Sequence, residues 1–372
     1  MSEALHKRVR AFAQSFDQQA SLASDTFDSL ALDIARFQYA HSPGFARLCP
    51  SGKGALKTVD DLPVIPSDVF RLTRVALHPP ELDVAVFRTS GTTAELTGQH
   101  PVRTLATKEQ LSLLQANRTL FSEYGRGIVV ALAPKPDGSS SLTHLMELLM
   151  AHFDGRALLA DPANVSYSAH EPGRFLVDTA GIDLDGLKRA ARLAKHRAEP
   201  LYVLATSFAM LAALDALDGD TIVAPARTKI MITGGFKGRT KTVDESELRR
   251  CIERCFNIGP EHIVGEYGMT ELTSQLFEQP GSPDHCYLAP PWLKVRALSP
   301  QSYEPVAAGE AGLAHFIDLA NIDSCLSIVT QDMIRIVDHG VLLLGRAPRS
   351  EVRGCSLPFE ALTLGGSSAK AS

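Results

Sequence analysis

The chain has 372 residues, of which 45% are hydrophobic, and its formal net charge is −5. That length allows two or three globular units with ordinary buried cores. The acidic balance and the lack of any lysine- and arginine-rich block argue against a nucleic-acid-binding protein. No apolar run approaches the length of a membrane-spanning helix, so we expect no membrane span.

The N-terminal residues contain no apolar segment typical of a secretory signal. The six cysteines are scattered and form neither a CxxC pair nor a disulfide framework. We therefore expect a cytoplasmic location, where thiols stay reduced.

The first forty residues are polar and contain no glycine, which predicts helical structure ending in a turn at residues 42–44. Two prolines predict an extended segment over residues 62–66. Strand-like and helical runs then alternate. The expected strands are residues 84–87, 128–133, 201–205, 229–233 and 262–266. The expected helices are residues 108–123, 141–152, 187–195, 207–217 and 245–256. This rhythm predicts an α/β fold with largely parallel strands and covering helices.

From about His285 onward the pattern changes to short strands separated by turn residues. The expected strands are residues 295–298, 312–318, 327–329, 333–337 and 341–344. We predict an α/β core over residues 1–284 and a β-rich subdomain of the same large domain over residues 285–345. We expect residues 346–372 to be a short C-terminal remnant with a flexible tail.

The first candidate site is a hydroxyl-rich loop directly after the strand expected at 84–87. It consists of Thr89, Ser90, Gly91, Thr92 and Thr93. A glycine among hydroxyl side chains lets backbone N–H groups and hydroxyls surround phosphate oxygens. The segment is not a Walker A loop, because no Gly-Lys-Ser/Thr follows. By itself, such a segment is more often an ordinary loop.

The second candidate site follows the strand expected at 262–266, where open α/β sheets bind ligands. Tyr267 offers a ring that can stack on a base, and Gly268 follows it. Thr270 can bond a phosphate, and Glu271 can hold Mg²⁺. The simpler alternative is a strand-to-helix turn with a capping threonine.

Two further segments complete the set. Gly234 and Gly235 follow a strand and permit the close approach of a flat ligand, while Lys237 can neutralise a phosphate or a carboxylate. Asp332, in a turn expected between two β segments, can bind ribose hydroxyls. A solvated surface lysine and an ordinary aspartate turn are the alternatives.

Together these segments resemble the adenylate-forming superfamily of acyl-CoA synthetases, adenylation domains and luciferases. In order, Thr89–Thr93, Tyr267–Glu271, Thr330–Asp332 and Gly345-Arg346 match its phosphate loop, its adenine and Mg²⁺ motif, its ribose motif and its hinge. The resemblance implies an enzyme that uses ATP and Mg²⁺ to activate a carboxylic acid.

The sequence departs from the family pattern at three places. Ala94 stands where the phosphate loop usually has glycine, and Gln331 replaces the glycine before Asp332. Only 26 residues follow Arg346, too few for the usual C-terminal domain with its catalytic lysine. We expect adenylation either to proceed without that lysine or to use Lys237 or Arg346 in its place, and the sequence leaves these alternatives open.

The compact form is similar to the acyl-protein synthetases of bacterial bioluminescence, over nearly the full length. That resemblance implies transfer of the acyl group from the adenylate to an enzyme cysteine near the C-terminus, and then to a protein such as an acyl reductase. Cys355 matches this position, and Arg353, two residues before it, favours a reactive thiolate. For the other five cysteines we expect buried, structural thiols.

Two alternatives remain at this level. One is an acid–CoA ligase related to phenylacetate–CoA ligases, and the other is a non-catalytic adenylate-fold protein. The acid cannot be read from the sequence. The helix that begins at Ser207-Phe208 and the turn at residues 233–236 are the expected walls of its pocket. His144 either lines that pocket or lies on a helix face.

Overall fold

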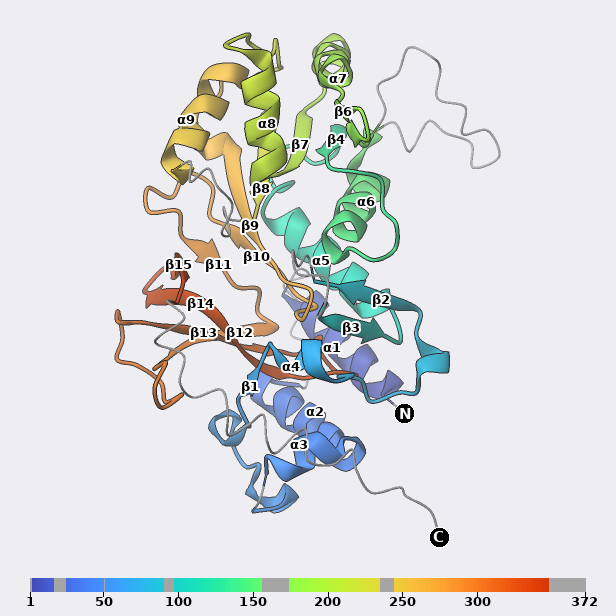
Figure 1. Ribbon diagram of the computed structural model, residues 1–372, viewed down its shortest axis with the longest axis vertical. Helices are drawn as coiled ribbons and strands as arrows, with labels where there is room; N and C mark the ends of the chain where they lie inside the picture. Colours follow the sequence, from blue (N-terminus) through green and yellow to red (C-terminus); the bar gives the residue numbers. More distant parts are fainter. Residues whose placement is uncertain are drawn as a thin grey trace.

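The computed structural model describes residues 2–16, 25–49, 51–89, 97–155, 174–234 and 244–347. Figure 1 shows an α/β part at one end and a part dominated by antiparallel strands at the other, with the N-terminal helices packed below the latter. None of the helices in these ranges combines the length and hydrophobicity needed to cross a membrane.

Four parallel strands form the centre of the α/β part. They are adjacent in chain order: β4 (Ile128–Leu132), β7 (Leu201–Thr206), β8 (Thr228–Thr233) and β9 (Ile263–Tyr267). The connections contain helices α6 (Ser141–Phe153), α7 (Leu184–Arg197), α8 (Ser207–Leu217) and α9 (Glu245–Phe256). The predicted alternation of strands and helices and the parallel pairing are confirmed.

Helices cover both faces of this sheet because alternate residues of each strand point to opposite sides. Val203 and Ile230 pack with residues of α7, α8 and α9 in one hydrophobic cluster. Leu204 and Met231 belong to a second cluster with α6 and the end of α5 (Ala106–Arg118). The strands therefore consist almost entirely of buried residues.

The sheet continues beyond β9 into antiparallel strands. The order is β9, β10 (Leu276–Glu278), β11 (Tyr287–Leu288), β15 (Gly340–Arg346), β14 (Ser327–Val337), β13 (Ala311–Asp318) and β12 (Leu293–Leu298). With β1 (Ile65–Pro66), which pairs in parallel with β14, the sheet has eleven strands. The fold is mixed α/β, as predicted.

The N-terminal helices pack against the antiparallel strands. They are α1 (Glu3–Ser15), α2 (Phe27–His41) and the short α3 (Pro43–Arg47). Ile34 of α2 shares one hydrophobic cluster with Trp292 and Phe316. The short helix α4 (Val69–Leu72) and the hairpin of β2 (Ala85–Arg88) and β3 (Gln99–Val102) lie beside this part, and β5 (Val177–Asp178) pairs with β6 (Gly181–Ile182).

Three local predictions are wrong. Ser42 does not end the helical region in an open turn, because its side chain caps α3 and Pro43 occupies the first helical position. The helix expected to reach residue 123 ends at Arg118, where the Thr119 hydroxyl bonds the carbonyl of Gln115. Residues 327–337 form one strand rather than two, since β13 and β15 pair with both sides of it.

Candidate nucleotide site

A cavity of about 420 Å³ lies between the parallel strands and the pair β14–β15. Its lining comes from the carboxyl ends of β8 and β9, the starts of α8 and α9, β11, β14 and β15. The lining residues are Ser207, Ile232, Thr233, Gly234, Glu245, Glu266, Tyr267, Gly268, Tyr287, Asp332, Met333, Leu343, Gly345 and Arg346. Five of the predicted site residues, Gly234, Tyr267, Gly268, Asp332 and Arg346, thus share one cavity.

The strand register explains why the polar residues of one wall meet. Thr206 pairs with Thr233, and Thr233 pairs with Glu266, so residues at the carboxyl ends of three neighbouring parallel strands form one row. Carboxyl ends of parallel strands are the usual place for a ligand in an open α/β sheet. The Thr233 hydroxyl donates to Glu266 Oε2 within this row.

The opposite wall carries Asp332, not in the turn that we expected but inside β14. Asp332 pairs with Arg346 and Met333 with Gly345, and the register shifts between Met333 and Ile334. The shift is a β-bulge, which re-aims side chains locally. The ribose candidate is therefore positioned by a strand with partners on both sides.

Tyr267 and Asp332 connect the two walls. The Tyr267 hydroxyl donates to Asp332 Oδ2 at 2.8 Å, and Arg346 Nε lies 3.4 Å from the other carboxylate oxygen. Burial and the charge of Asp332 raise the pKa of Tyr267 well above its usual value, so its hydroxyl stays a donor. The Tyr267 ring stacks on Phe316 with centroids 5.8 Å apart.

The turn after Tyr267 is held by buried side chains from distant parts of the chain. His100 Nδ1 lies 2.7 Å from the Thr270 carbonyl oxygen, and Asn321 donates to the Glu271 carbonyl at 2.9 Å. The Asp318 carboxylate accepts the N–H groups of residues 273 and 274, and burial raises its pKa. Lys108 Nζ donates to the carbonyl of residue 273 at 3.2 Å, and burial lowers the pKa of this lysine to about 8.

Thr270 and Glu271 lie beside the β2–β3 hairpin, outside the cavity lining. The Thr270 hydroxyl donates to the Arg88 carbonyl at 3.3 Å. Thr89 closes the base of the hairpin, because its N–H donates to the Gly98 carbonyl and its hydroxyl accepts the Gly98 N–H, both at 2.9 Å. Glu271 is 6% exposed. The predicted phosphate-loop start and the predicted Mg²⁺ ligand are therefore on neighbouring segments.

Seven of the predicted site residues lie outside the described residues. They are Ser90, Gly91, Thr92, Thr93, Gly235, Lys237 and Cys355. Within the described ranges, no group of three or more histidine, cysteine, aspartate or glutamate side chains is arranged to hold a metal ion by itself.

Four of the five remaining cysteines are buried as expected, and for Cys251 the expectation of a buried thiol is wrong. Cys49, Cys255, Cys286 and Cys325 are buried, and Cys251 is partly exposed. Burial raises the pKa of the Cys325 thiol to about 12, which makes it a poor nucleophile.

Sequence reasoning missed Glu266, Tyr287 and the charged network behind them. Glu278 accepts hydrogen bonds from the Gly265 N–H at 2.7 Å and from Arg249 at 2.6 Å. A Cβ at Gly265 would collide with the Tyr287 hydroxyl and lie 2.9 Å from Glu278 Oε2. The lack of a side chain at residue 265 was the one signal in the sequence that could have pointed to this crowding.

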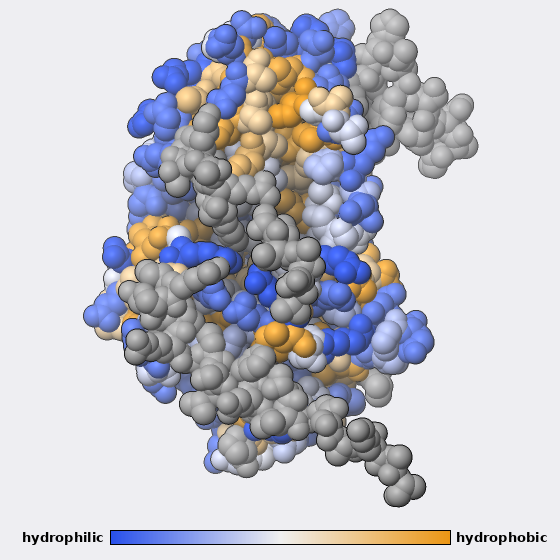
Figure 2. Space-filling view, in the orientation of Figure 1, coloured by the Kyte–Doolittle hydropathy of each residue, from blue (hydrophilic) through white to orange (hydrophobic). Residues whose placement is uncertain are grey.

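The two segments expected to form the walls of an acyl pocket both contribute to the cavity described above. Ser207, Thr233 and Gly234 line the cavity, whereas Phe208 is 36% exposed on the first turn of α8. Figure 2 shows apolar residues gathered over this end of the molecule, around α8. His144 lies on α6, with its ring centroid 5.5 Å from that of Phe87 and its Nε2 3.3 Å from Glu109.

The chain is similar to known proteins in sequence and in fold. Residues 195–363 match the family model described as acyl-protein synthetase, LuxE. The long-chain-fatty-acid–luciferin-component ligase of Aliivibrio fischeri is 23% identical over 329 residues, which cover 86% of this chain and 80% of the relative. The ligase of the same name from Vibrio harveyi is 23% identical over 341 residues, 87% of this chain and 84% of the relative.

Among solved structures, an open conformation of 2-hydroxyisobutyryl-CoA ligase in complex with 2-HIB-AMP and CoA has a TM-score of 0.59 at 12% identity. The match covers 86% of this chain and 74% of that one. The same enzyme in its postadenylation state gives a TM-score of 0.60, with 86% and 67% covered. In fold the chain is thus similar to this ligase, and in sequence it is similar to acyl-protein synthetases and to the two luciferin-component ligases.

The similarity to the LuxE family is found in the C-terminal part of the chain. The family model matches residues 195–363, which are less than half of the chain and begin near the end of α7, and the two luciferin-component ligases extend the similarity toward the N-terminus. The resemblance stated from the motifs is confirmed.

Proposed function

We propose that the chain activates a carboxylic acid, of the fatty-acid class, with ATP, and that Cys355 then takes the acyl group. In the first step a carboxylate oxygen attacks the α-phosphorus of ATP and pyrophosphate leaves. In the second step the Cys355 thiolate attacks the acyl carbonyl carbon and AMP leaves. The thioester then passes its acyl group to an acceptor protein such as an acyl reductase.

The observation that carries the proposal is the shared cavity of Gly234, Tyr267 and Asp332. A flat base fits between an aromatic ring and a glycine backbone, and a carboxylate suits the two ribose hydroxyls. The volume of about 420 Å³ lies within the range of ligand pockets, about 300–1,000 Å³. The names of the two luciferin-component ligases support the fatty-acid class.

Charge on the phosphates is the main obstacle to the first step, because the attacking carboxylate is also an anion. Thr270 and the hairpin base at Thr89 lie together, where their segments can surround the phosphates. Arg346 lines the cavity next to Asp332 and supplies a cation. Lys237 remains the other candidate for this role.

Glu271 is the candidate ligand for Mg²⁺. A single buried carboxylate fits this ion, because Mg²⁺ in nucleotide sites is usually held by one or two carboxylates together with phosphate oxygens and waters. When bound, the ion would neutralise charge on the phosphates. Asn321 donates a hydrogen bond to the carbonyl of Glu271 and so holds the backbone of this residue in place.

The test uses ATP, Mg²⁺ and a panel of radiolabelled fatty acids with the wild type, Cys355→Ala and, as a matched control, Cys251→Ala. We expect acid-dependent ATP–pyrophosphate exchange in all three proteins. Hydroxylamine-labile label should appear on the wild type and on the Cys251 variant only. Product formation that requires CoA and ignores the Cys355 change would instead identify a CoA ligase. No exchange with any acid would reject adenylation.

A further inference from the structure

His100 is a buried polar side chain that none of the predicted motifs includes. It lies in β3 and is 4% exposed. Its Nδ1 is 2.7 Å from the Thr270 carbonyl oxygen, and its Nε2 is 3.0 Å from Ser324 Oγ. Because a carbonyl oxygen can only accept, Nδ1 carries the proton and donates it. Burial lowers the pKa of His100 to about 4, so the neutral ring leaves Nε2 to accept from the Ser324 hydroxyl.

His100 joins the two segments that the proposed reaction must bring together. In the β2–β3 hairpin it pairs with Phe87, and the next residue of β2, Arg88, accepts the Thr270 hydroxyl through its carbonyl. Thr270 is therefore fixed to the base of the hairpin twice, through its backbone oxygen and through its side chain. The loop that starts at Thr89 begins at this base.

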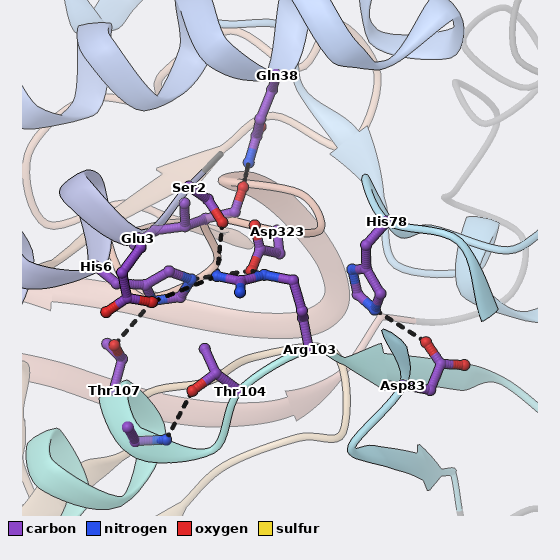
Figure 3. Close-up of polar contacts among 12 residues, drawn as sticks. Ser2, Glu3, His6, Gln38, His78, Asp83, Arg103, Thr104, Thr107 and Asp323 are labelled. Carbon is purple, nitrogen blue, oxygen red and sulfur yellow. Dashed lines mark hydrogen bonds and ion pairs between the residues drawn. The ribbon is translucent and has the colours of Figure 1, made fainter. Parts of the chain in front are cut away.

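The Ser324 side of the connection is itself anchored. Figure 3 shows the neighbouring Asp323 contacted by His6 and Arg103, which come from α1 and the residue after β3. The distances to the Asp323 Oδ2 atom are 2.9 Å from His6 Nε2 and 2.8 Å from Arg103 Nε. The ring of His100 is thus held between a fixed loop and the turn after Tyr267.

A buried imidazole is costly unless both ring nitrogens are bonded, and an apolar side chain would fill the same space more cheaply. The hydrogen bonds are therefore the reason that the position needs histidine. A displacement of about 1 Å in a reacting group can reduce a rate about 100-fold. A donor that fixes the Thr270 carbonyl also fixes the position of Glu271, the next residue. Loss of that donor can therefore reduce the rate on the same scale.

We propose that His100 is a positioning residue for adenylation, which fixes Thr270 and Glu271 against the hairpin that carries the phosphate loop. The inference rests on the proposed function for the reaction that it serves. It predicts that the Nδ1–H donor to Thr270 matters for turnover and that the Nε2 contact to Ser324 matters much less.

The test compares His100→Asn with His100→Gln in the full-length protein. The asparagine amide reaches the place of Nδ1 and keeps a donor for Thr270, whereas the glutamine amide reaches the place of Nε2. Both variants replace a buried ring by an amide, so their melting temperatures should fall alike. In ATP–pyrophosphate exchange, we expect kcat near the wild-type value for His100→Asn and a loss of about 10- to 100-fold for His100→Gln. The KM for ATP should change little in either variant, since His100 does not line the cavity.

Ser324→Ala is the matched control, and it should keep kcat. A second measurement does not depend on turnover. Hydrogen–deuterium exchange of the peptide that contains residues 270–274 should be faster in His100→Gln than in His100→Asn. If the wild type exchanges pyrophosphate and the glutamine variant matches the asparagine variant in kcat, the inference fails and the proposed function stands. If the wild type shows no exchange with any acid, the proposed function fails. Equal deuterium uptake in the two variants would then overturn the role of His100 as well.

Discussion

Tyr267 donates its hydroxyl hydrogen to Asp332 across 2.8 Å, although the two residues are 65 positions apart in the chain. This bond joins the carboxyl edge of the parallel strands to β14, which belongs to the antiparallel strands. The proposed base-binding and ribose-binding groups therefore form one unit. A nucleotide would meet a preformed wall there, which lowers the entropic cost of binding.

Loss of the Asp332 charge should weaken nucleotide binding more than loss of the Tyr267 hydroxyl. Hydrogen bonds to charged groups contribute about 1.5–3 kcal/mol, so we expect Asp332→Asn to raise the Kd for ATP by at least about tenfold. Tyr267→Phe keeps the ring and should cost less. Isothermal titration with ATP measures both effects. Asp338→Asn, an exposed carboxylate between β14 and β15, is the matched control and should bind like the wild type. Equal binding by Asp332→Asn would remove Asp332 from the site.

Gly265→Ala should destabilise the protein, because the added Cβ meets the Tyr287 hydroxyl and Glu278. Overpacking of this kind typically costs about 1–3 kcal/mol of the free energy of unfolding. Tyr287→Phe removes the hydroxyl and should recover part of that loss in the double variant. Urea unfolding of the two single variants and the double variant gives the coupling energy. Additive effects would mean that the crowding at Gly265 has another source.

Arg249→Met should be strongly destabilising. Arg249 and Glu278 are both almost completely buried and lie 2.6 Å apart, so the substitution leaves a buried carboxylate without its main counter-ion. Breaking such a pair costs about 3–5 kcal/mol. Arg250→Met, at the next position of α9, is the natural control, since that arginine is 59% exposed and its pair with Glu247 is worth little. Similar unfolding free energies for the two variants would contradict this assignment.

Acid should destabilise the protein from about pH 6.5 downward through its buried histidines. Burial lowers the pKa of His100 to about 4 and that of His315 to about 3. Below pH 6.5 the unfolded chain binds these protons before the folded one does, so stability falls until the folded pKa values are reached. Each histidine contributes up to about 1.4 kcal/mol per pH unit. Urea unfolding at several pH values gives the free energy of unfolding as a function of pH. Below pH 6.5 this free energy should fall less steeply with decreasing pH in His315→Gln than in the wild type. The same dependence on pH in both proteins would contradict the prediction.

The sequence predicts the α/β part well because its signals are local. Residues 128–132 and 201–206 are buried runs, and each is followed by a helix. The side chain of Ser140 caps α6, and that of Thr206 caps α8. Helix α9 was predicted with its observed bounds for the same reason, since Asp244 caps it. The antiparallel strands β10 and β11 were missed, since they have only three and two residues.

Residues of the candidate site that belong to a sequence motif were predicted. Residues that reach the site only because distant segments lie together in the fold were missed. Tyr267 and Asp332 were proposed from their motifs and line one cavity, but the strand at Asp332 was interpreted as a turn because Gln331 and Asp332 are polar. Gln331 Nε2 donates to Asp68 at 2.8 Å, which explains the polar residue within a strand. His100 and Glu278 act through residues far away in sequence, so no local pattern marks them.

ATP–pyrophosphate exchange with and without a fatty acid, for the wild type and Glu271→Gln, is the most direct test of carboxylate activation. Glu261→Gln, an exposed glutamate beside β9, is the matched control. We predict exchange that depends on the acid in the wild type and in Glu261→Gln. In Glu271→Gln, we predict a loss of at least about 100-fold, on the scale of one group that stabilises transition-state charge. Wild-type exchange in Glu271→Gln, or no acid-dependent exchange in any protein, would contradict the proposed adenylation.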